Sequence, residues 1–374
     1  VHDIRRASAR RMPSIDLLVF SSNGARGALQ RGLTRATWLD AWVGGGGRGA
    51  GSGRRIALFA LCGAEAERLT PLREGRGGGA VGSEEAPRLG LLHLTCTDGY
   101  RHLLLKTLHA LRWLLRRRPP SLGPPARLIF KTDEDTYLCV GSLGATLSTL
   151  PQLYSLYLGT FSDHTKLRLR RTERWRDTQH FALFNFSSYP PYAQGALYGL
   201  SSDLAAAALH IGESPPLSLL SLPLDKVPVN EDATIGTLVH LWARGNSSFR
   251  WRPPEWAQMR GPRRIPQPAR LAASARGRVA FVSLPVRVYL SVDAYGGDRR
   301  QSGLLRVNNE TVARAENSAA CRMAASWKLV GVHKLRPLEA LSCARASCAA
   351  CGCSADPDPP GAFERLAREW DHAR

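Results

Sequence analysis

The residues best suited to chemistry are three carboxylates, Asp133, Glu134 and Asp135, which follow an apolar run at residues 128–130 after two intervening residues. Two carboxylates separated by one residue point to the same side of an extended chain, so Asp133 and Asp135 could together hold one hard divalent cation. Such a cation keeps positions open for phosphate oxygens and neutralises a diphosphate leaving group. An acidic loop that only caps the next helix is the alternative, and the triplet by itself favours that alternative.

A second acidic pair, Glu231 and Asp232, begins a helical pattern that runs to Ala243. A carboxylate at the start of a helix is often no more than a cap. In a transferase the same placement could present Asp232 as a general base toward an acceptor hydroxyl. Without further context these residues favour the cap.

The elements that must position these acids alternate between strands and helices. Short apolar runs predict strands at residues 15–20, 55–61, 90–94, 126–131 and 156–159. Helical spacing predicts helices at 29–42, 100–117 and 201–209, and we expect a short helix just before a loop at 73–86. This alternation predicts an α/β fold with a largely parallel sheet. Ligands then bind at the carboxyl ends of the strands, where the acidic triplet stands.

Composition excludes some classes of protein and leaves others open. The chain has 374 residues, with 51 basic against 31 acidic and a formal charge of +20. Disorder and a coiled coil are excluded for the whole chain, and no apolar run is long enough to span a bilayer. A bias toward GC-rich codons would explain why only six of the basic residues are Lys. The functional interpretations of the charge are binding of nucleic acid, of an anionic glycan or of a nucleotide diphosphate. No recognition motif supports nucleic acid.

The eight cysteines indicate a compartment more than a catalytic site. The tail cluster at 343–353 could bind zinc, but disulfides are favoured because a second, more distant ligand pair is missing. Sequons at Asn185, Asn246 and Asn309 fit the same secretory route. Residues 62, 96 and 139 lie on or beside predicted strands, so we expect buried core cysteines there rather than nucleophiles.

Six motifs in order resemble the β-1,3-glycosyltransferases of glycosyltransferase family 31, over about Ile15 to Leu341. They lie at residues 30–38, 98–107, 131–135, 189–201, 231–232 and 332–334. Segments 156–161 and 174–177 look most similar to the subgroup that adds galactose to galactosylxylose in the proteoglycan linkage region.

This resemblance implies a GT-A fold, Rossmann-like, with a mostly parallel central sheet flanked by helices. It implies a UDP-sugar donor, manganese, inversion at the anomeric carbon, and a lumenal Golgi domain behind an upstream type II membrane anchor. We expect a basic leader at 1–14 and the transferase domain at 15–341. An insertion at about 253–320 would interrupt that domain, and a Cys-rich tail at 342–374 would follow it.

The resemblance also assigns roles to individual residues. Asp232 would be the catalytic base. Asp133, Asp135 and His333 would be the metal ligands. The residues that bind the nucleotide or the manganese would together be Arg31, Arg35, Asp98, Lys106, Asp133, Glu134, Asp135 and His333. The acceptor or sugar pocket would comprise Trp175, Tyr189, Tyr192, Gly195 and Glu231. Trp175 is as readily a surface anchor, the two tyrosines could only brace a turn, and His333 by itself would more often be a packed residue.

Three departures from the family pattern qualify these roles. His102 stands where the family has Asn, and Glu134 replaces the middle Asp. Ala196 and Leu197 replace two of three glycines, which should narrow the space beside the sugar. This change therefore bears most on the identities of the donor sugar and of the acceptor.

We expect a metal-dependent, inverting transfer of galactose from UDP-galactose to a hydroxyl of a protein-linked glycan or proteoglycan, forming a β-1,3 bond. Nucleic acid is not an expected partner. Two alternatives remain open. One is transfer of N-acetylglucosamine or N-acetylgalactosamine by the same chemistry, and the other is an inactive glycan-binding homologue. Intact Asp133, Asp135 and Asp232 argue against the inactive homologue.

Overall fold

The computed structural model describes residues 13–44, 53–72, 88–138, 140–148, 150, 153–162, 165–170, 175–245, 280–283, 286–288 and 331–333. The strands are β1 Ile15–Phe20, β2 Arg55–Leu61, β3 Arg68–Pro71, β4 Leu89–His93, β5 Leu128–Asp133, β6 Thr136–Leu138, β7 Leu156–Ser162, β8 Tyr192–Ser201, β9 Ala280–Ser283, β10 Val286–Val288 and β11 Gly331–His333. The α-helices are α1 Gly24–Thr34, α2 Asp40–Gly44, α3 Leu103–Arg112, α4 Val140–Ser148, α5 Thr178–Phe184, α6 Ser202–Glu213 and α7 Glu231–Gly245. Within these ranges, no helix is long and apolar enough to cross a membrane.

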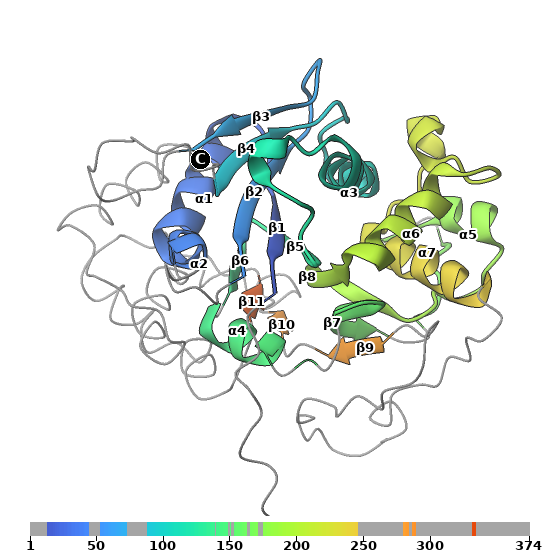
Figure 1. The fold of residues 1–374 in the computed structure, drawn as a ribbon. Helices are drawn as coiled ribbons and strands as arrows, with labels where there is room; N and C mark the ends of the chain where they lie inside the picture. The colour runs from blue at the N-terminus through green and yellow to red at the C-terminus, as the bar shows by residue number, and fades with distance from the viewer. Residues whose placement is uncertain are drawn as a thin grey trace, which may run out of the picture.

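A central sheet of eight strands organises the fold, in the order β3-β4-β2-β1-β5-β8-β7-β9 (Figure 1). The four strands β4, β2, β1 and β5 are parallel, whereas β8 is antiparallel to both β5 and β7. A second sheet joins β10, β11 and β6. The parallel centre flanked by helices confirms the predicted α/β class, and it places the carboxyl ends of β1, β2, β4 and β5 along one edge.

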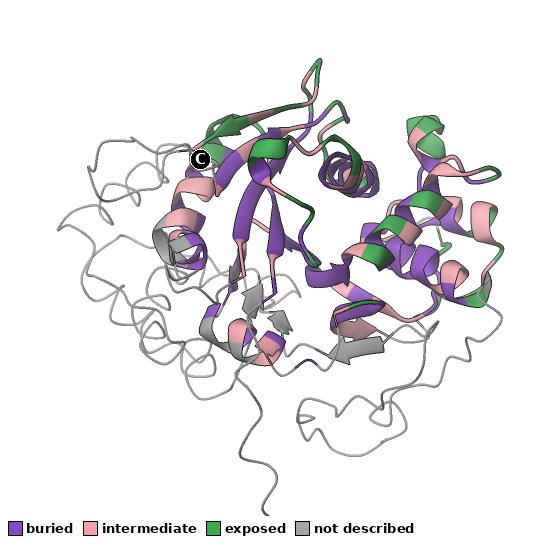
Figure 2. Cartoon of the chain, viewed as in Figure 1, coloured by how far each residue is buried: buried purple, intermediate pink, exposed green. Residues whose placement is uncertain are grey.

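Both faces of the sheet are buried because alternate residues of each central strand face different helices. Leu18 and Phe20 of β1 belong to one hydrophobic cluster, which includes residues of α3, α6 and α7. Leu17 and Val19 belong to the other, which contains Trp38, Trp42 and residues of α4. Figure 2 shows the resulting purple core of strands between the two helical layers. This three-layer packing gives the loops at the strand ends a rigid base.

The structure confirms the five predicted strands, two with their predicted ends and three with shifted ends, and differs at other points. The short helix expected before residue 73 is wrong, because Arg68–Pro71 forms the antiparallel edge strand β3. The strand β8 was not predicted, and neither were α4 and α5. Part of the segment expected as an insertion at 253–320 supplies β9, which pairs with β7 in the main sheet. Residues 1–12 of the leader and the whole Cys-rich tail lie outside the described residues.

The strand β8 contains an irregularity that matters for the site. Its pairing with β7 shifts between Gly159 and Phe161, which pair with Tyr198 and Ala193 respectively. Residues 194–197 of β8 therefore bulge out of the ladder opposite a single residue of β7. The bulge frees backbone groups of Gly195 and Ala196 for contacts with side chains.

Candidate active site

A cavity of about 350 Å³ opens beside the carboxyl end of β5, between the start of α3, the start of β8 and the start of α7. It gathers seven of the residues predicted from the sequence: Asp133, Trp175, Tyr189, Tyr192, Gly195, Glu231 and Asp232. Residues separated by up to a hundred positions in the chain thus share one cavity, although their predicted chemical roles remain predictions.

Lys131 is the centre of the polar contacts at the base of this cavity. Its buried Nζ lies 2.7 Å from Asp133 Oδ1 and 3.6 Å from Glu231 Oε2. It also donates to the backbone oxygen of Gly195 at 2.6 Å. Burial alone would lower the pKa of Lys131, but the nearby carboxylates of Asp133 and Glu231 raise it above its usual value. The permanent ammonium therefore fixes both acids and the bulged segment of β8 in one arrangement.

Glu231 is held more tightly than its predicted place in the acceptor pocket suggests. Its side chain is buried, and Oε1 accepts hydrogen bonds from the hydroxyls of Thr107 and Tyr198. Together with the ion pair to Lys131, these contacts occupy both carboxylate oxygens. This geometry suits a group that orients Lys131 better than a group that is free to bind a sugar.

Asp232 faces the cavity from the first turn of α7. Its Oδ2 accepts from the backbone amide of Gly195 at 2.9 Å, and its Oδ1 accepts from the amide of Ala233 at 2.8 Å. Burial raises the pKa of Asp232 from its ordinary 3.8 to about 6, and the charge of Glu231 adds to that rise. The two amides and Lys131 oppose it. A carboxylate with this pKa can accept a proton from a substrate near neutral pH.

The bulge explains what the altered glycine segment does. Leu197 is fully buried in the hydrophobic core, so the expectation that it narrows the space beside the sugar is wrong. Ala196 does line the cavity, and its backbone oxygen accepts from the hydroxyls of Thr132 and Thr136. A Cβ added to Gly195 would lie 3.5 Å from both Asp232 Oδ2 and Lys131 Nζ. These are ordinary van der Waals distances, so Gly195 borders both charged groups but has room for a Cβ.

Aromatic side chains also line the cavity. Tyr100 is 61% exposed, and its ring lies 5.2 Å from that of Trp175 between centroids. Tyr189 and Tyr192 pack at 5.8 Å, and the Tyr189 hydroxyl accepts from Asn230 Nδ2 at 2.6 Å. Aromatic faces of this kind suit the apolar face of a sugar ring. The tyrosines do more than brace a turn, because they line the cavity itself.

The sequence reasoning missed several residues of this cavity. Tyr100 and Lys131 stand inside motifs that were recognised, so their positions carried a signal. Lys166 and Arg168 are exposed and line the cavity from the segment before α5, where no motif marked them. Asn230 directly precedes the acidic pair and could have been found as its neighbour.

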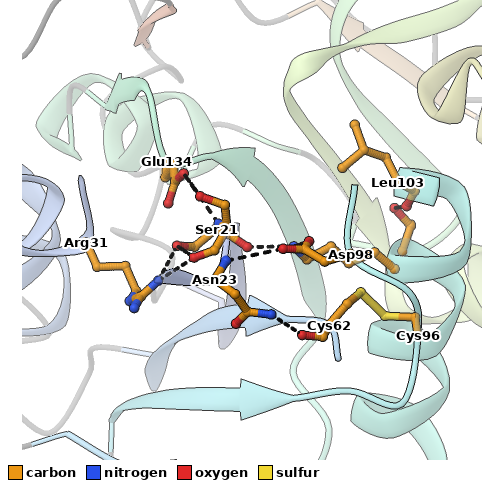
Figure 3. Close-up of polar contacts among 11 residues, drawn as sticks. Ser21, Asn23, Arg31, Cys62, Cys96, Asp98, Leu103 and Glu134 are labelled. Atoms are coloured by element: carbon orange, nitrogen blue, oxygen red, sulfur yellow. Dashed lines mark hydrogen bonds and ion pairs between the residues drawn. A yellow bond between two sulfur atoms is a disulfide. The ribbon is translucent and has the colours of Figure 1, made fainter. Parts of the chain in front are cut away.

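A second cluster lies at the carboxyl end of β1 and contains other residues predicted to bind the donor (Figure 3). Asp98 accepts from the amide of Asn23 at 3.2 Å and pairs with Lys106 at 3.5 Å. Lys106 is buried and donates to the backbone oxygen of Ser21 at 2.6 Å. Burial lowers the pKa of Lys106, against the influence of Asp98. These contacts fix the loop between β1 and α1.

Arg31 and Glu134 join the same loop, whereas Arg35 does not. Arg31 donates to Ser21 Oγ at 2.7 Å and to the backbone oxygen of Ser22 at 2.8 Å. Glu134 Oε1 accepts from the hydroxyl of Ser22 at 3.2 Å, and burial raises the pKa of Glu134. Arg35 pairs with Asp40 at 3.3 Å. The structure thus places Arg31, Asp98, Lys106 and Glu134 around one loop but gives Arg35 a partner elsewhere.

A disulfide between Cys62 and Cys96 braces this second cluster. It joins the segments that follow β2 and β4, with the two Cα atoms 4.9 Å apart. Burial of both cysteines in the core is confirmed. Asn23 Nδ2 contacts the backbone oxygen of Cys62, and Asp98 follows two residues after Cys96 (Figure 3). Residue 139 lies outside the described residues.

The geometry of the acidic triplet differs from the extended chain assumed above. Asp133 ends β5, and Glu134 and Asp135 form a turn before β6. Of the three, only Asp133 lines the cavity. The strand β11 pairs with β6 so that His333 lies opposite Thr136, next in sequence to Asp135, although the His333 side chain is outside the described part of the chain.

Carboxylates at the end of β5, with a histidine-bearing strand in register beside them, are donors that fit a divalent cation. Among the side chains that the structure describes, no three His, Cys, Asp or Glu converge as a metal site. The metal assignment therefore stays a prediction about Asp133, Asp135 and His333.

Comparisons with known proteins identify relatives of this chain. Human beta-1,3-galactosyltransferase 4 is 30% identical over 251 residues, which cover 59% of this chain and 61% of that protein. The UDP-GlcNAc:betaGal beta-1,3-N-acetylglucosaminyltransferase 7 of Mus musculus is 25% identical over 201 residues, 53% of this chain and 45% of that protein. The chain thus spans about three fifths or less of the length of these relatives. A family model described as Galactosyltransferase matches residues 30–219, which is half of the chain. The chain therefore belongs to the galactosyltransferase family.

Proposed function

We propose that this chain is a metal-dependent, inverting β-1,3-galactosyltransferase that moves galactose from UDP-galactose to a hydroxyl of a protein-linked glycan. The observation that carries the proposal is Asp232, a desolvated carboxylate with a pKa raised to about 6, in the same cavity as Asp133. The resemblance to enzymes named for β-1,3-galactosyl transfer supports the donor and the linkage.

In this mechanism Asp232 is the general base. Its carboxylate takes the proton from the acceptor hydroxyl while that oxygen forms a bond to the anomeric carbon of galactose. The bond from the anomeric carbon to the diphosphate oxygen breaks, and its electron pair leaves with UDP. The backbone amide of Gly195 holds Asp232 in place through a hydrogen bond of 2.9 Å to Oδ2. Lys131 Nζ in turn holds Gly195 by donating to its backbone oxygen at 2.6 Å. Attack from the side opposite the leaving group inverts the anomeric carbon.

The donor would bind toward the carboxyl ends of β1 and β5. Asp133 and Asp135, with His333 as a further ligand, would hold a manganese ion that neutralises the charge of the diphosphate. Lys131 lies within 2.7 Å of Asp133, so it limits the negative charge that the donor phosphates meet. The loop fixed by Arg31, Asp98 and Lys106 would shape the nucleotide pocket.

The acceptor would enter past Tyr100, Trp175, Tyr189 and Tyr192. The proposed acceptor is a galactosylxylose unit of a proteoglycan linkage region, because the sequence resembles the subgroup that acts on it. Transfer of N-acetylglucosamine is the second candidate, because a relative at 25% identity carries that activity in its name. Donor and acceptor therefore have to be tested together.

A Golgi lumenal location belongs to the same proposal. The disulfide between Cys62 and Cys96 suits an oxidising compartment. Asn185, in a sequon, is exposed at the end of α5, where an attached glycan would have room. Mobility of the expressed chain before and after enzymatic deglycosylation tests whether the chain passes through the secretory route.

Release of UDP with and without manganese, measured over UDP-galactose, UDP-N-acetylglucosamine and UDP-N-acetylgalactosamine with a panel of glycan acceptors, tests the proposal. We expect turnover with UDP-galactose only. The variant Asp232→Asn should abolish turnover and retain UDP binding, and Asp135→Ala should remove the manganese-dependent part of UDP binding. Asp203→Asn is a matched control, since Asp203 accepts from the amide and the hydroxyl of Ser155 and does not line the cavity. No turnover of any donor together with no binding of UDP would refute the enzyme assignment.

A further inference from the structure

Asp177 is a fully buried carboxylate that the proposed reaction does not use. It precedes α5 and accepts from the backbone amide of His180 at 3.2 Å, as an ordinary N-cap does. A capping role needs only that contact. Asp177 makes four more, all with groups outside α5.

These further contacts join three separate segments. Oδ1 also accepts from the amide of Val229 at 3.1 Å. Oδ2 accepts from the amide of Asn230 at 3.1 Å, from Asn230 Nδ2 at 3.2 Å and from the hydroxyl of Tyr189 at 3.1 Å. A buried carboxylate with five neutral donors is held firmly, and each donor is held by it.

The segment that Asp177 fixes leads directly into the proposed catalytic turn. Asn230 precedes Glu231 and Asp232, and its backbone oxygen accepts from the amide and the hydroxyl of Thr234 at 3.0 and 2.8 Å. The Asn230 side chain also donates to the backbone oxygen of Trp175 at 3.3 Å. One carboxylate therefore sets the start of α7 and the positions of two aromatic residues of the cavity wall.

The helix α5 is itself anchored to α7, which gives Asp177 a rigid base. His180 is fully buried, and its Nε2 lies 2.9 Å from the hydroxyl of Thr237 in α7. The Thr237 hydroxyl donates to the backbone oxygen of Ala233, so His180 is the donor in their contact. Asp177 thus contacts the chain before Asp232, at residues 229 and 230, and His180 contacts it after Asp232, at Thr237.

We infer that Asp177 is a positioning residue for transfer: it orders residues 229–232 and so places the Asp232 carboxylate against the acceptor. The catalytic part of this inference rests on the proposed function. A one-ångström misplacement of a reacting group costs up to about 100-fold in rate, so the placement of α7 has a measurable consequence.

The variant Asp177→Asn tests this with little change in volume. An amide has one acceptor oxygen, so either the Asn230 side or the His180 side loses its partner. Hydrogen exchange, read by mass spectrometry, should be faster for residues 229–236 in the variant than in the wild type. We expect kcat per folded molecule to fall by about 10- to 100-fold, with the KM for UDP-galactose within about twofold of the wild type.

Asp16→Asn is the control for general loss of stability. Asp16 is also buried, but it pairs with Arg118 near the amino end of β1, away from the cavity. This variant should lower the melting temperature without faster exchange at 229–236 and without a change in kcat. Asn230→Ala is the second variant in case Asp177→Asn does not fold, because it removes only the side-chain contacts and should lower kcat in the same direction.

The effects of Asp177→Asn and Asn230→Ala should combine to less than their product, since both act through Asn230. Unchanged exchange at 229–236 in Asp177→Asn would overturn the inference whether or not the chain transfers galactose. Unchanged kcat in both single variants would overturn it as well. A wild type that transfers no sugar, with faster exchange in the variant, would refute the proposed function and leave the structural link between Asp177 and α7 intact.

Discussion

Replacing Asp232 by Asn separates the two roles that its sequence position allows, because a base and a helix cap predict different dependences of stability on pH. The carboxylate is desolvated, and its pKa is about 6 in the folded chain against an ordinary 3.8. Between these two pH values the folded chain binds more protons than the unfolded chain. The free energy of unfolding therefore falls as the pH rises through this window.

The size of this effect follows from the same two values. The difference between 3.8 and about 6 corresponds to a loss of about 3 kcal/mol in the free energy of unfolding. This loss is absent below pH 3.8 and complete above about pH 6. Asn carries no charge and has no such dependence. At neutral pH the variant therefore gains stability by losing the buried charge. A cost of about 1 to 3 kcal/mol partly offsets this gain, because the Asn amide would face the backbone N–H of Gly195 or Ala233.

Urea unfolding of the wild type and of Asp232→Asn between pH 4 and pH 8 measures this directly. The difference between their unfolding free energies should move in favour of the variant by about 3 kcal/mol from the acid to the neutral end. The charged and titratable groups near Asp232 include Glu231, Lys131, Asp133, Tyr100, Tyr157 and Tyr192. They are common to both proteins, so the comparison isolates Asp232. Turnover of the wild type should be about tenfold lower at pH 5 than at its plateau.

Parallel stability curves, with the variant lower by about 1 kcal/mol at every pH, would show that Asp232 is only a helix cap. A retained turnover in Asp232→Asn would refute the base independently of stability. Either result would return the acidic pair to the structural role that its sequence position favours.

Three further changes probe the rest of the site. Lys131→Met leaves Glu231 buried without its cation and should cost about 3 to 5 kcal/mol in urea unfolding; an unchanged midpoint would show that the ion pairs contribute little. Removing the disulfide by Cys62→Ser with Cys96→Ser should cost about 2 to 4 kcal/mol and weaken UDP binding in calorimetry, and UDP affinity equal to that of the wild type would separate the brace from the donor site. Leu197→Gly should lower the melting temperature, at a cost of about 3 kcal/mol, without changing donor preference; a changed preference would place Leu197 beside the sugar after all.

The sheet was predictable because its strands are short apolar runs bounded by turn residues. The runs ending at Phe20, Leu61 and Phe130 are buried on both faces, and such strands need no alternation to be recognised. The edge strand β3 has only partly buried or exposed residues, including a proline, so its composition carried no such signal. The strand β8 was hidden by the motif that it contains, since its glycine and tyrosine residues were interpreted as a binding segment and not as a strand.

The residues of the cavity were predictable as a group, but their partners were not. Motif order indicated that Asp133, Gly195 and Asp232 work together. It placed Lys131 beside the acidic triplet but gave no information on its contacts, which are the carboxylates of Asp133 and Glu231 and the backbone oxygen of Gly195. Backbone acceptors carry no side-chain identity, so a contact of this kind leaves no residue type in the sequence to mark it.

The bulge in β8 shows why counting glycines misjudged this segment. Successive residues of a regular strand alternate between its faces, and a bulge interrupts that alternation. Between residues 194 and 197 the chain leaves the ladder with β7, so Gly195 and Ala196 reach the cavity while Leu197 packs into the core. A larger residue at 197 therefore adds to the core and does not border the cavity. Only a three-dimensional register could distinguish the two residues that border the cavity, Gly195 and Ala196, from their neighbour Leu197, which packs into the core.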